Sequence, residues 1–347
     1  MPNVFVSRIA GDYLGAIRAG LDHIGLSAFV SRSSVLFVKP NLTLPVYSPG
    51  VMTSIAALEA VLIALSDYTP NLILGDSDPG GYNRFSMDAV YHRTGIFDIA
   101  ARLGVKVVNL SRVERRRVSL SVGKREVEIG LPRLLTDDID FLVTVPVPKV
   151  HMYTVLSLAF KNQWGCIPEP GDRLRLHPYF NEVVLRVNEL VKTRVAVVDG
   201  SYGLDESGPL RGRPVPLGWV VVADSPGAAA RVVCDLLQIP VERVPHLRLA
   251  AERGLVPPFE RIVLNQDLGP FVADPFHRHL ALTDYPGLLA FRSPVLAYLA
   301  YFSPFAALLH KLLYLFRKPF YDYGLYTSRS PGETEMPGET PPHPRRD

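Results

Sequence analysis

The chain has 347 residues, of which 48% are hydrophobic and 20% charged, and its formal net charge at pH 7 is +3. This composition is typical of a folded protein with one large domain or two smaller ones, and it excludes wholesale disorder. The small net charge gives no support for a nucleic-acid partner. Two cysteines, Cys166 and Cys234, are too few for an iron–sulfur cluster within this chain or for a disulfide framework. We therefore expect a reducing compartment. The N-terminal residues also lack a signal-peptide pattern, which favours the cytoplasm.

Short apolar runs alternate with helical patterns along most of the chain. The runs predicted to be strands are Val4–Ile9, Val35–Val38, Leu72–Leu74, Val105–Val108, Phe141–Val145, Val195–Val198 and Trp219–Val222. Their continuous apolar character is typical of strands buried on both faces of a mainly parallel sheet. The helical patterns lie between them, at Tyr13–Ile24, Ser54–Leu65, Ser86–Leu103, Tyr179–Lys192 and Ala228–Leu237. The sequence therefore predicts one α/β domain over residues 1–285, a mainly parallel sheet with helices on both faces.

One segment between these runs has a different period. Residues 115–131, RRRVSLSVGKREVEIGL, alternate apolar and polar side chains on either side of Gly123. This pattern predicts a β-hairpin insertion with one solvated face. The arginines of Arg115–Arg117 have no aromatic residues among them, so we assign them to that face rather than to a nucleic-acid interface.

The last part of the chain is apolar and then polar. Residues 286–326 include the apolar stretch 292–320, in which Pro304 and Lys311 interrupt a run otherwise long enough to cross a membrane. Two short helices at the inner face of a membrane fit this pattern. Packing against the chain's own domain or a partner subunit is the alternative. Residues 327–347, rich in proline and charge, are predicted to be disordered.

Polar residues follow five of the predicted strands. They are Lys39, Asn41 and Thr43; Asp76, Ser77 and Asp78; Lys149 and His151; Asp199, Asp205 and Glu206; and Asp224 and Ser225. Ligands of open α/β sheets bind beyond the carboxyl ends of the strands. The five loops therefore predict one composite site.

Lysines at two of these strand ends indicate the charge of the ligand. A lysine directly after a buried strand either extends to solvent or neutralises an acidic group. Because Lys39 and Lys149 both occupy this position, we favour an acidic partner. His151 lies two residues after Lys149, whose charge lowers the pKa of a neighbouring imidazole and keeps it neutral. It is the candidate general base, although a lone histidine is more often structural.

The run that ends at Val145 continues in VPVPKVHMYTVLSLAFKNQWGC, which we interpret as an apolar helix after the strand-end loop. On such a helix Thr154 and Lys161 share one face and would line the cleft if the helix runs along it. Lys161 would then neutralise the ligand together with Lys39 and Lys149. Asn41 and Asn162 would orient it.

Acidic and glycine residues complete the candidate set. Asp76 and Asp199 are candidates for holding a divalent cation through oxygen ligands, with turn or cap formation as the alternative for each. Ser77, Gly80 and Gly81 lie in GDSDPGG, which allows a close backbone approach to a ligand or simply forms a tight turn. This stretch lacks the lysine of a phosphate loop and the GxGxxG spacing of a dinucleotide site.

The assembled motifs resemble the domain-of-unknown-function 362 family. The matching pieces are VLFVKPNLT, GDSDPGG, VPVPKVHMYTVLSLAFKNQWGC, VVDGSYGLDESGPLRG and SPGAAARVVCDLLQ, within residues 4–256. The resemblance implies the fold and the position of the site, but no reaction. Some family members carry an added iron–sulfur segment, which this chain's cysteines cannot match. The family's Asp-Pro-x-Ala-x-Asp pattern reads SPGAAA here, with Ser225 and Ala230 in place of the aspartates.

Two functional hypotheses from different classes follow. The favoured one is an enzyme-like protein that binds a small carboxylate or phosphate at the carboxyl edge of the sheet. The rival is a non-catalytic, membrane-associated binding or redox-partner module that docks through residues 292–320.

Overall fold

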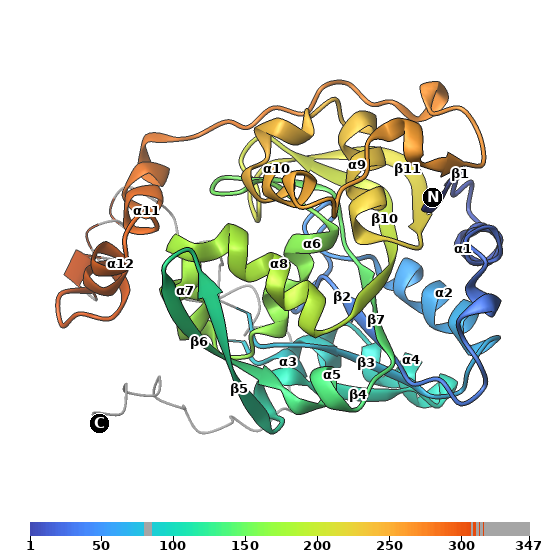
Figure 1. Cartoon of the computed structure of the whole chain (residues 1–347), viewed down its shortest axis with the longest axis horizontal. Helices are drawn as coiled ribbons and strands as arrows, with labels where there is room; N and C mark the ends of the chain where they lie inside the picture. The colour runs from blue at the N-terminus through green and yellow to red at the C-terminus, as the bar shows by residue number, and fades with distance from the viewer. Residues whose placement is uncertain (80–84, 307, 310–311, 313–314, 316–347) are drawn as a thin grey trace.

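The computed structural model of the protein describes residues 1–79, 85–306, 308, 309, 312 and 315. Gly80, Gly81 and the tail predicted to be disordered lie outside the described residues. A mainly parallel sheet forms the centre of the fold, in the order β12-β1-β11-β10-β7-β2-β3-β4, with β8 beside β10 and β9 beside β8 (Figure 1). Its strands are β1 (Asn3–Arg8), β2 (Leu36–Pro40), β3 (Leu72–Asp76), β4 (Lys106–Asn109), β7 (Phe141–Val145), β8 (Lys149–His151), β9 (Val155–Ser157), β10 (Thr193–Asp205), β11 (Arg213–Ala223) and β12 (Val263–Leu264).

All seven predicted strands are present, and the mainly parallel α/β fold is confirmed. Strand β11, however, pairs antiparallel with both β10 and β1. It therefore ends at the opposite edge of the sheet from β2, β3 and β7. The close β10–β11 pairing depends on Gly200, because a Cβ there would lie 2.0 Å from the ring of Trp219.

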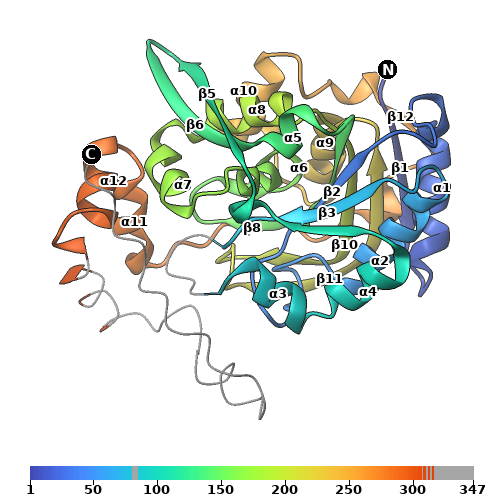
Figure 2. The ribbon, with the colours of Figure 1, turned by 90° about the horizontal axis from the view of Figure 1, so that it is seen from below.

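Helices cover both faces of the sheet (Figure 2). One face carries α1 (Tyr13–His23), α2 (Ile55–Ser66), α3 (Met87–Arg93) and α4 (Ile96–Leu103); the other carries α6 (Ala159–Asn162), α8 (Phe180–Leu190), α9 (Pro226–Leu236) and α10 (Pro245–Glu252). Successive side chains of a strand point to opposite faces. In β2, accordingly, Leu36 and Val38 are buried in the core on the side of α1 to α4. Phe37 is buried in the core on the other side.

The predicted β-hairpin insertion is formed by β5 (Arg115–Val122) and β6 (Arg125–Pro132), a separate two-stranded sheet that leads into α5 (Arg133–Asp137). Leu120 and Val127 pair across it and are buried, whereas the arginines at its start are exposed. Gly123 forms its turn with a φ of +59°, a conformation that glycine adopts without strain.

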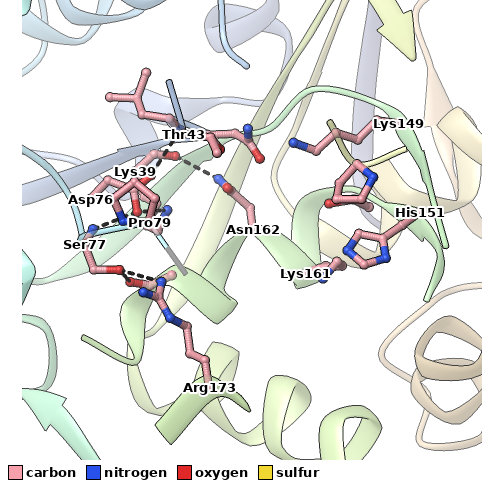
Figure 3. A pocket seen from close by; sticks show the side chains of 15 residues that line it. Lys39, Thr43, Asp76, Ser77, Pro79, Lys149, His151, Lys161, Asn162 and Arg173 are labelled. Atoms are coloured by element: carbon pink, nitrogen blue, oxygen red, sulfur yellow. Dashed lines mark hydrogen bonds and ion pairs between the residues drawn. The ribbon is translucent and has the colours of Figure 1, made fainter. Parts of the chain in front are cut away.

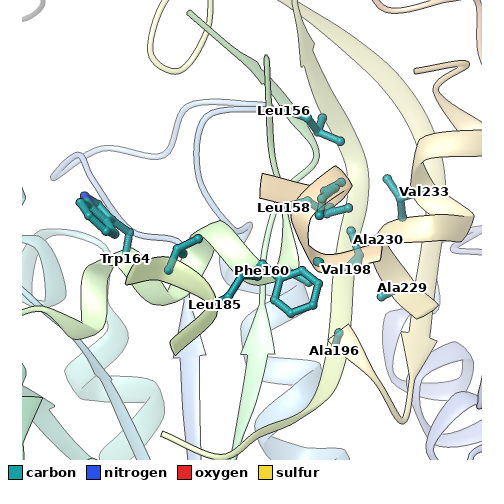
Figure 4. Close-up of a cluster of buried hydrophobic side chains, with 14 of the residues drawn as sticks. Leu156, Leu158, Phe160, Trp164, Leu185, Ala196, Val198, Ala229, Ala230 and Val233 are labelled. Carbon is teal, nitrogen blue, oxygen red and sulfur yellow. The ribbon is translucent and has the colours of Figure 1, made fainter. Parts of the chain in front are cut away.

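The segment after β8 differs from its prediction. Residues 155–157 form β9, so the helix expected there is reduced to α6, followed by a 3-10 helix over Gln163–Cys166. Leu156, Leu158 and Phe160 are buried in the core shared with α8, α9 and β10 (Figure 4). The intervening Ser157 and the following Lys161 are thereby turned toward the opposite side, where the cavity described below lies.

Short helices close one end of the molecule. They are α7 (Pro170–Leu176), α11 (Tyr285–Ala290) and α12 (Pro294–Tyr301), with α11 and α12 forming the predicted apolar helical segment (Figure 1). Between α11 and α12, Phe291 stacks on His177 with 3.9 Å between ring centroids. Within the described residues, none of the helices has the length and apolar character needed to cross a membrane.

Candidate functional site

An ion pair joins the carboxyl ends of β2 and β3. Lys39 Nζ lies 2.7 Å from Asp76 Oδ1, and both side chains are almost fully buried. The carboxylate also accepts hydrogen bonds from the backbone N–H groups of Leu42 and Ser77, at 3.2 and 2.8 Å. Lys39 Nζ donates to the carbonyl of Pro40 at 3.0 Å. The pair thus has the additional hydrogen bonds that a buried ion pair needs to be tolerated.

Gly165 packs directly against this ion pair. A Cβ at this position would lie 2.8 Å from Asp76 Oδ1 and 2.9 Å from Lys39 Nζ, so a larger residue would displace one of the charges. The Gly165 carbonyl also accepts a hydrogen bond from Ser77 Oγ at 2.6 Å. The segment after α6 is therefore fastened to the ends of β2 and β3.

Beside this junction lies a cavity of about 140 Å³ that is partly open to solvent (Figure 3). Its lining is Lys39, Asn41, Leu42, Thr43, Asp76, Ser77, Pro79, Lys149, His151, Ser157, Lys161, Asn162, Gly165, Arg173 and Pro209. Four of these side chains are basic and one is a carboxylate. Three separate parts of the sequence thus bring an excess of positive charge into a buried space.

Lys149 contributes from β8. Its Nζ donates to the carbonyl of Val51 at 2.6 Å and has no carboxylate within ion-pair distance among the described residues. Burial lowers the pKa of Lys149 to about 7; the charge of Lys39 acts in the same direction, and Asp76 opposes both. The ammonium is therefore poorly compensated, and an anion in the cavity would stabilise it.

Lys161 contributes from α6 and is the least compensated of the lysines. It is only 9% exposed, and within the described residues its Nζ donates no hydrogen bond and forms no ion pair. Its Nζ lies over the ring of Phe180, 4.8 Å from the centroid. Burial, together with repulsion from Lys149 and Arg173, lowers the pKa of Lys161 to about 7.

His151 has a hydrogen-bonding pattern that defines its tautomer. Its Nδ1 accepts the backbone N–H groups of Tyr153 and Thr154, at 3.1 and 3.4 Å. Burial, with Lys161 and Lys149 nearby, holds the pKa of His151 well below its usual value, so the ring is neutral. The proton of a neutral ring whose Nδ1 is an acceptor lies on Nε2. In this tautomer His151 lines the cavity with its Nε2–H donor, and its role as a general base stays a prediction.

Arg173 on α7 is a cavity residue that the sequence reading missed. Its Nη1 donates to Ser77 Oγ at 2.9 Å and its Nη2 donates to the carbonyl of Asp78. Arg173 is buried, and burial lowers its pKa, with Asp76 opposing. It follows no strand, and the neighbouring Arg175 is half exposed. No local pattern in GDRLRLHPYF distinguishes the two arginines.

Of the three predicted polar residues around the lysines, two line the cavity and one does not. Asn41 and Asn162 both line the cavity, but the amide of Asn162 already donates to the Lys39 carbonyl and to Thr144 Oγ1, at 3.0 and 2.9 Å. Asn162 thus aligns β2 and β7 with α6, and its role in orienting an anion stays a prediction. Thr154 lies before β9 rather than on a helix, donates to the Leu156 carbonyl and does not line the cavity. Its predicted role in ligand binding stays a prediction.

Asp76 and Asp199 do not form a common metal site. The carboxylate of Asp199 accepts from the backbone N–H groups of Ser54 and Ser201 and from the Tyr13 hydroxyl, at 2.7, 3.0 and 3.1 Å, and it is not part of the cavity lining. Through its hydrogen bond with the backbone N–H of Ser54, the Asp199 carboxylate stabilises the start of α2. Throughout the part of the chain that the structure describes, no three His, Cys, Asp or Glu side chains are grouped to bind a metal.

The expected fifth strand end is also absent from the site. Because β11 runs antiparallel to β10, the turn after it lies at the opposite edge, where Asp224 accepts a hydrogen bond from the Asn3 backbone at 3.0 Å. Ser225 caps α9, and Ala230 is buried in the core. The departures from the family pattern at Ser225 and Ala230 therefore leave the cavity unaffected.

Comparison with known proteins identifies the family. The model of the domain-of-unknown-function 362 family matches residues 36–235, which include every cavity residue, and the chain belongs to this family. A thylakoid-associated protein of Synechocystis is 23% identical over 260 residues, covering 72% of this chain and 77% of its own.

Two solved structures show a weaker likeness. The lactate racemase apoprotein of Thermoanaerobacterium thermosaccharolyticum gives a TM-score of 0.42 at 12% identity, with 70% of this chain and 57% of that chain covered. A protein from Thermotoga maritima gives a TM-score of 0.38 at 15% identity, with 58% of this chain and 53% of that chain covered. The chain thus covers little more than half of the length of each solved structure.

The charge of Lys161 makes a testable contribution to stability. Replacing a buried, uncompensated charge with an apolar side chain of similar length removes its desolvation cost, so Lys161→Met should raise the free energy of unfolding of the ligand-free protein by about 1–4 kcal/mol. Urea unfolding at pH 7 measures this. The exposed Lys106→Met is the matched control, with an expected change within about 0.5 kcal/mol. A destabilised Lys161→Met would show that the ammonium has a structural role.

Proposed function

We propose that the protein binds a small anion, a carboxylate or a phosphate, in the cavity between β2, β3, β8, α6 and α7. The observation that supports this most directly is the excess of buried positive charge, four basic side chains around one carboxylate. Buried charges are normally paired. Lys39 has Asp76 as its partner, whereas Lys149 and Lys161 have no carboxylate at ion-pair distance among the described residues.

The size of the cavity limits the ligand. A volume of about 140 Å³ corresponds to the volume of about five water molecules in the liquid. Most cavities that bind drug-sized molecules exceed about 300 Å³. The ligand is therefore a compact mono- or dianion, with Lys149 supplying its charge partner and His151 Nε2 donating a hydrogen bond to it.

Anion binding should appear as thermal stabilisation. Oxalate or inorganic phosphate at about one hundred times its dissociation constant should raise the melting temperature of the wild-type protein by about 5 °C. Lys149→Met should abolish this shift, because it removes a charge from the cavity while retaining the length of the side chain. Lys106→Met, on the exposed surface, should keep the full shift. Equal shifts in all three proteins would refute the proposed site.

The same binding should depend on pH. In the free cavity the pKa values of Lys149 and Lys161 lie at about 7. A bound anion favours the protonated amines and raises both values, so affinity is highest below pH 7 and falls as pH rises. Above pH 7 each lysine that must take up a proton costs about tenfold in affinity per pH unit. Calorimetric titration with oxalate, a dianion from pH 6 to 8.5, measures the slope, and a flat profile would contradict the assignment.

The second candidate function, association with a membrane surface, is favoured by the apolar residues of the C-terminal helices. Of the 15 exposed large hydrophobic side chains among the described residues, 11 lie between Leu282 and Leu315. The sequence adds basic residues at Arg292, Lys311, Arg317 and Lys318, which suit an anionic lipid surface. The relative from Synechocystis that is described as thylakoid-associated supports the same proposal.

Liposome co-sedimentation separates this candidate from a soluble binding role. The full-length protein should sediment with vesicles containing anionic lipid, and a truncation that ends before Arg292 should remain in the supernatant. Added salt should weaken binding to anionic vesicles, because the basic residues contribute through charge. Equal sedimentation of both proteins would remove the C-terminal helices from any membrane role.

A further inference from the structure

The amine of Lys161 is placed differently from an anion-binding ammonium. Such lysines usually donate to fixed carbonyls or carboxylates, as Lys149 Nζ does to Val51 and Lys39 Nζ does to Asp76. Lys161 Nζ has no such partner among the described residues; it lies over the Phe180 ring and lines the cavity. Its side chain is more than nine-tenths buried.

The groups around Lys161 favour the neutral amine. The titratable neighbours that influence it or are influenced by it come from four elements and are Lys149, His151, Arg173, His177 and His246. Two of these are cationic and none is a carboxylate. The histidines have depressed pKa values and stay uncharged. A desolvated lysine next to other cationic groups is the arrangement that activates an amine as a nucleophile.

We propose that Lys161 forms an imine with the carbonyl group of a small 2-oxo acid bound in the cavity. This rests on the proposed anion-binding function and adds the class of substrate. Lys149 would pair with the carboxylate of the substrate. His151, whose Nε2 carries its proton, would donate a hydrogen bond to the carbonyl oxygen. A 2-oxo acid carries its carboxylate and its carbonyl group on adjacent carbons. It therefore offers one group to the cation and one to the amine within the limited volume.

The covalent step needs no further reactant. The Nζ lone pair attacks the carbonyl carbon, a C–N bond forms, and the carbonyl oxygen takes up a proton to give a carbinolamine. The C–O bond then breaks, and the oxygen leaves as water with the two hydrogens that the amine has lost. The product is an imine, which takes up one proton from solvent to become an iminium. His151 and the Phe180 ring contribute position and polarity to this step, and neither changes its covalent state.

Reductive trapping tests the proposal on the full-length protein. Incubation with pyruvate, the smallest stable 2-oxo acid, and sodium cyanoborohydride should add one group per chain with the mass of pyruvic acid less one oxygen atom. Peptide mapping should place at least about tenfold more label on Lys161 than on the exposed Lys106 and Lys124. At a saturating concentration of pyruvate the labelling rate should rise as pH increases above 7, because the bound carboxylate raises the pKa of Lys161 and the amine reacts only after it has lost its proton. Lactate, which has no carbonyl, should give no adduct.

Variants and binding measurements separate the possible outcomes. Lys161→Arg keeps a cation but cannot form an imine, so its adduct should fall at least about tenfold while the variant still melts cooperatively. If oxalate stabilises the wild type but no adduct forms, or the label falls on Lys149 or equally on all lysines, imine formation is overturned and anion binding stands. If Lys161 is labelled but oxalate and phosphate give no stabilisation, the anion-binding function is overturned instead.

Discussion

The buried ion pair between Lys39 and Asp76 is the constraint on which the rest of the site depends. Two charges removed from water are tolerated only with good geometry and further hydrogen bonds. Here β2 and β3 supply the charges, the backbone of the loop after β2 supplies a donor, and Gly165 leaves the space. Three segments distant in the sequence are thereby fixed within one hydrogen-bonded junction. The cavity is the space beside this junction.

Much of the fold could be predicted because strands buried on both faces of a sheet have continuous apolar sequences. Continuous apolar runs identified the seven main strands, and the lysines that follow two of them pointed to the cavity. Both signals are local: each depends on a strand and the residue directly after it. The alternation around Gly123 identified the hairpin in the same way. Membership of the family agrees with these motifs, since its match over residues 36–235 includes both lysines and the hairpin.

The features that could not be predicted depend on long-range geometry. An apolar strand has the same composition in either direction, so the reversal of β11, and with it the removal of Asp224 from the site, leaves no local trace. Arg173 reaches the cavity only because α7 folds back over Asp78. Hydrophobicity alone also could not distinguish β9 from a helical turn, which misplaced Thr154. The donor role of His151 follows from two backbone N–H groups that only the folded loop brings to its Nδ1.

The stack of Phe291 on His177 links the C-terminal helices to the cavity. His177 Nδ1 donates a hydrogen bond to the Arg173 carbonyl, and its ring lies near Phe180, the residue beneath Lys161. Any partner that moved Phe291 would therefore disturb the groups that hold both Arg173 and Lys161 in place. Thermodynamic coupling is reciprocal. Occupation of the cavity and engagement of the C-terminal helices would then alter each other's equilibrium constants by the same factor.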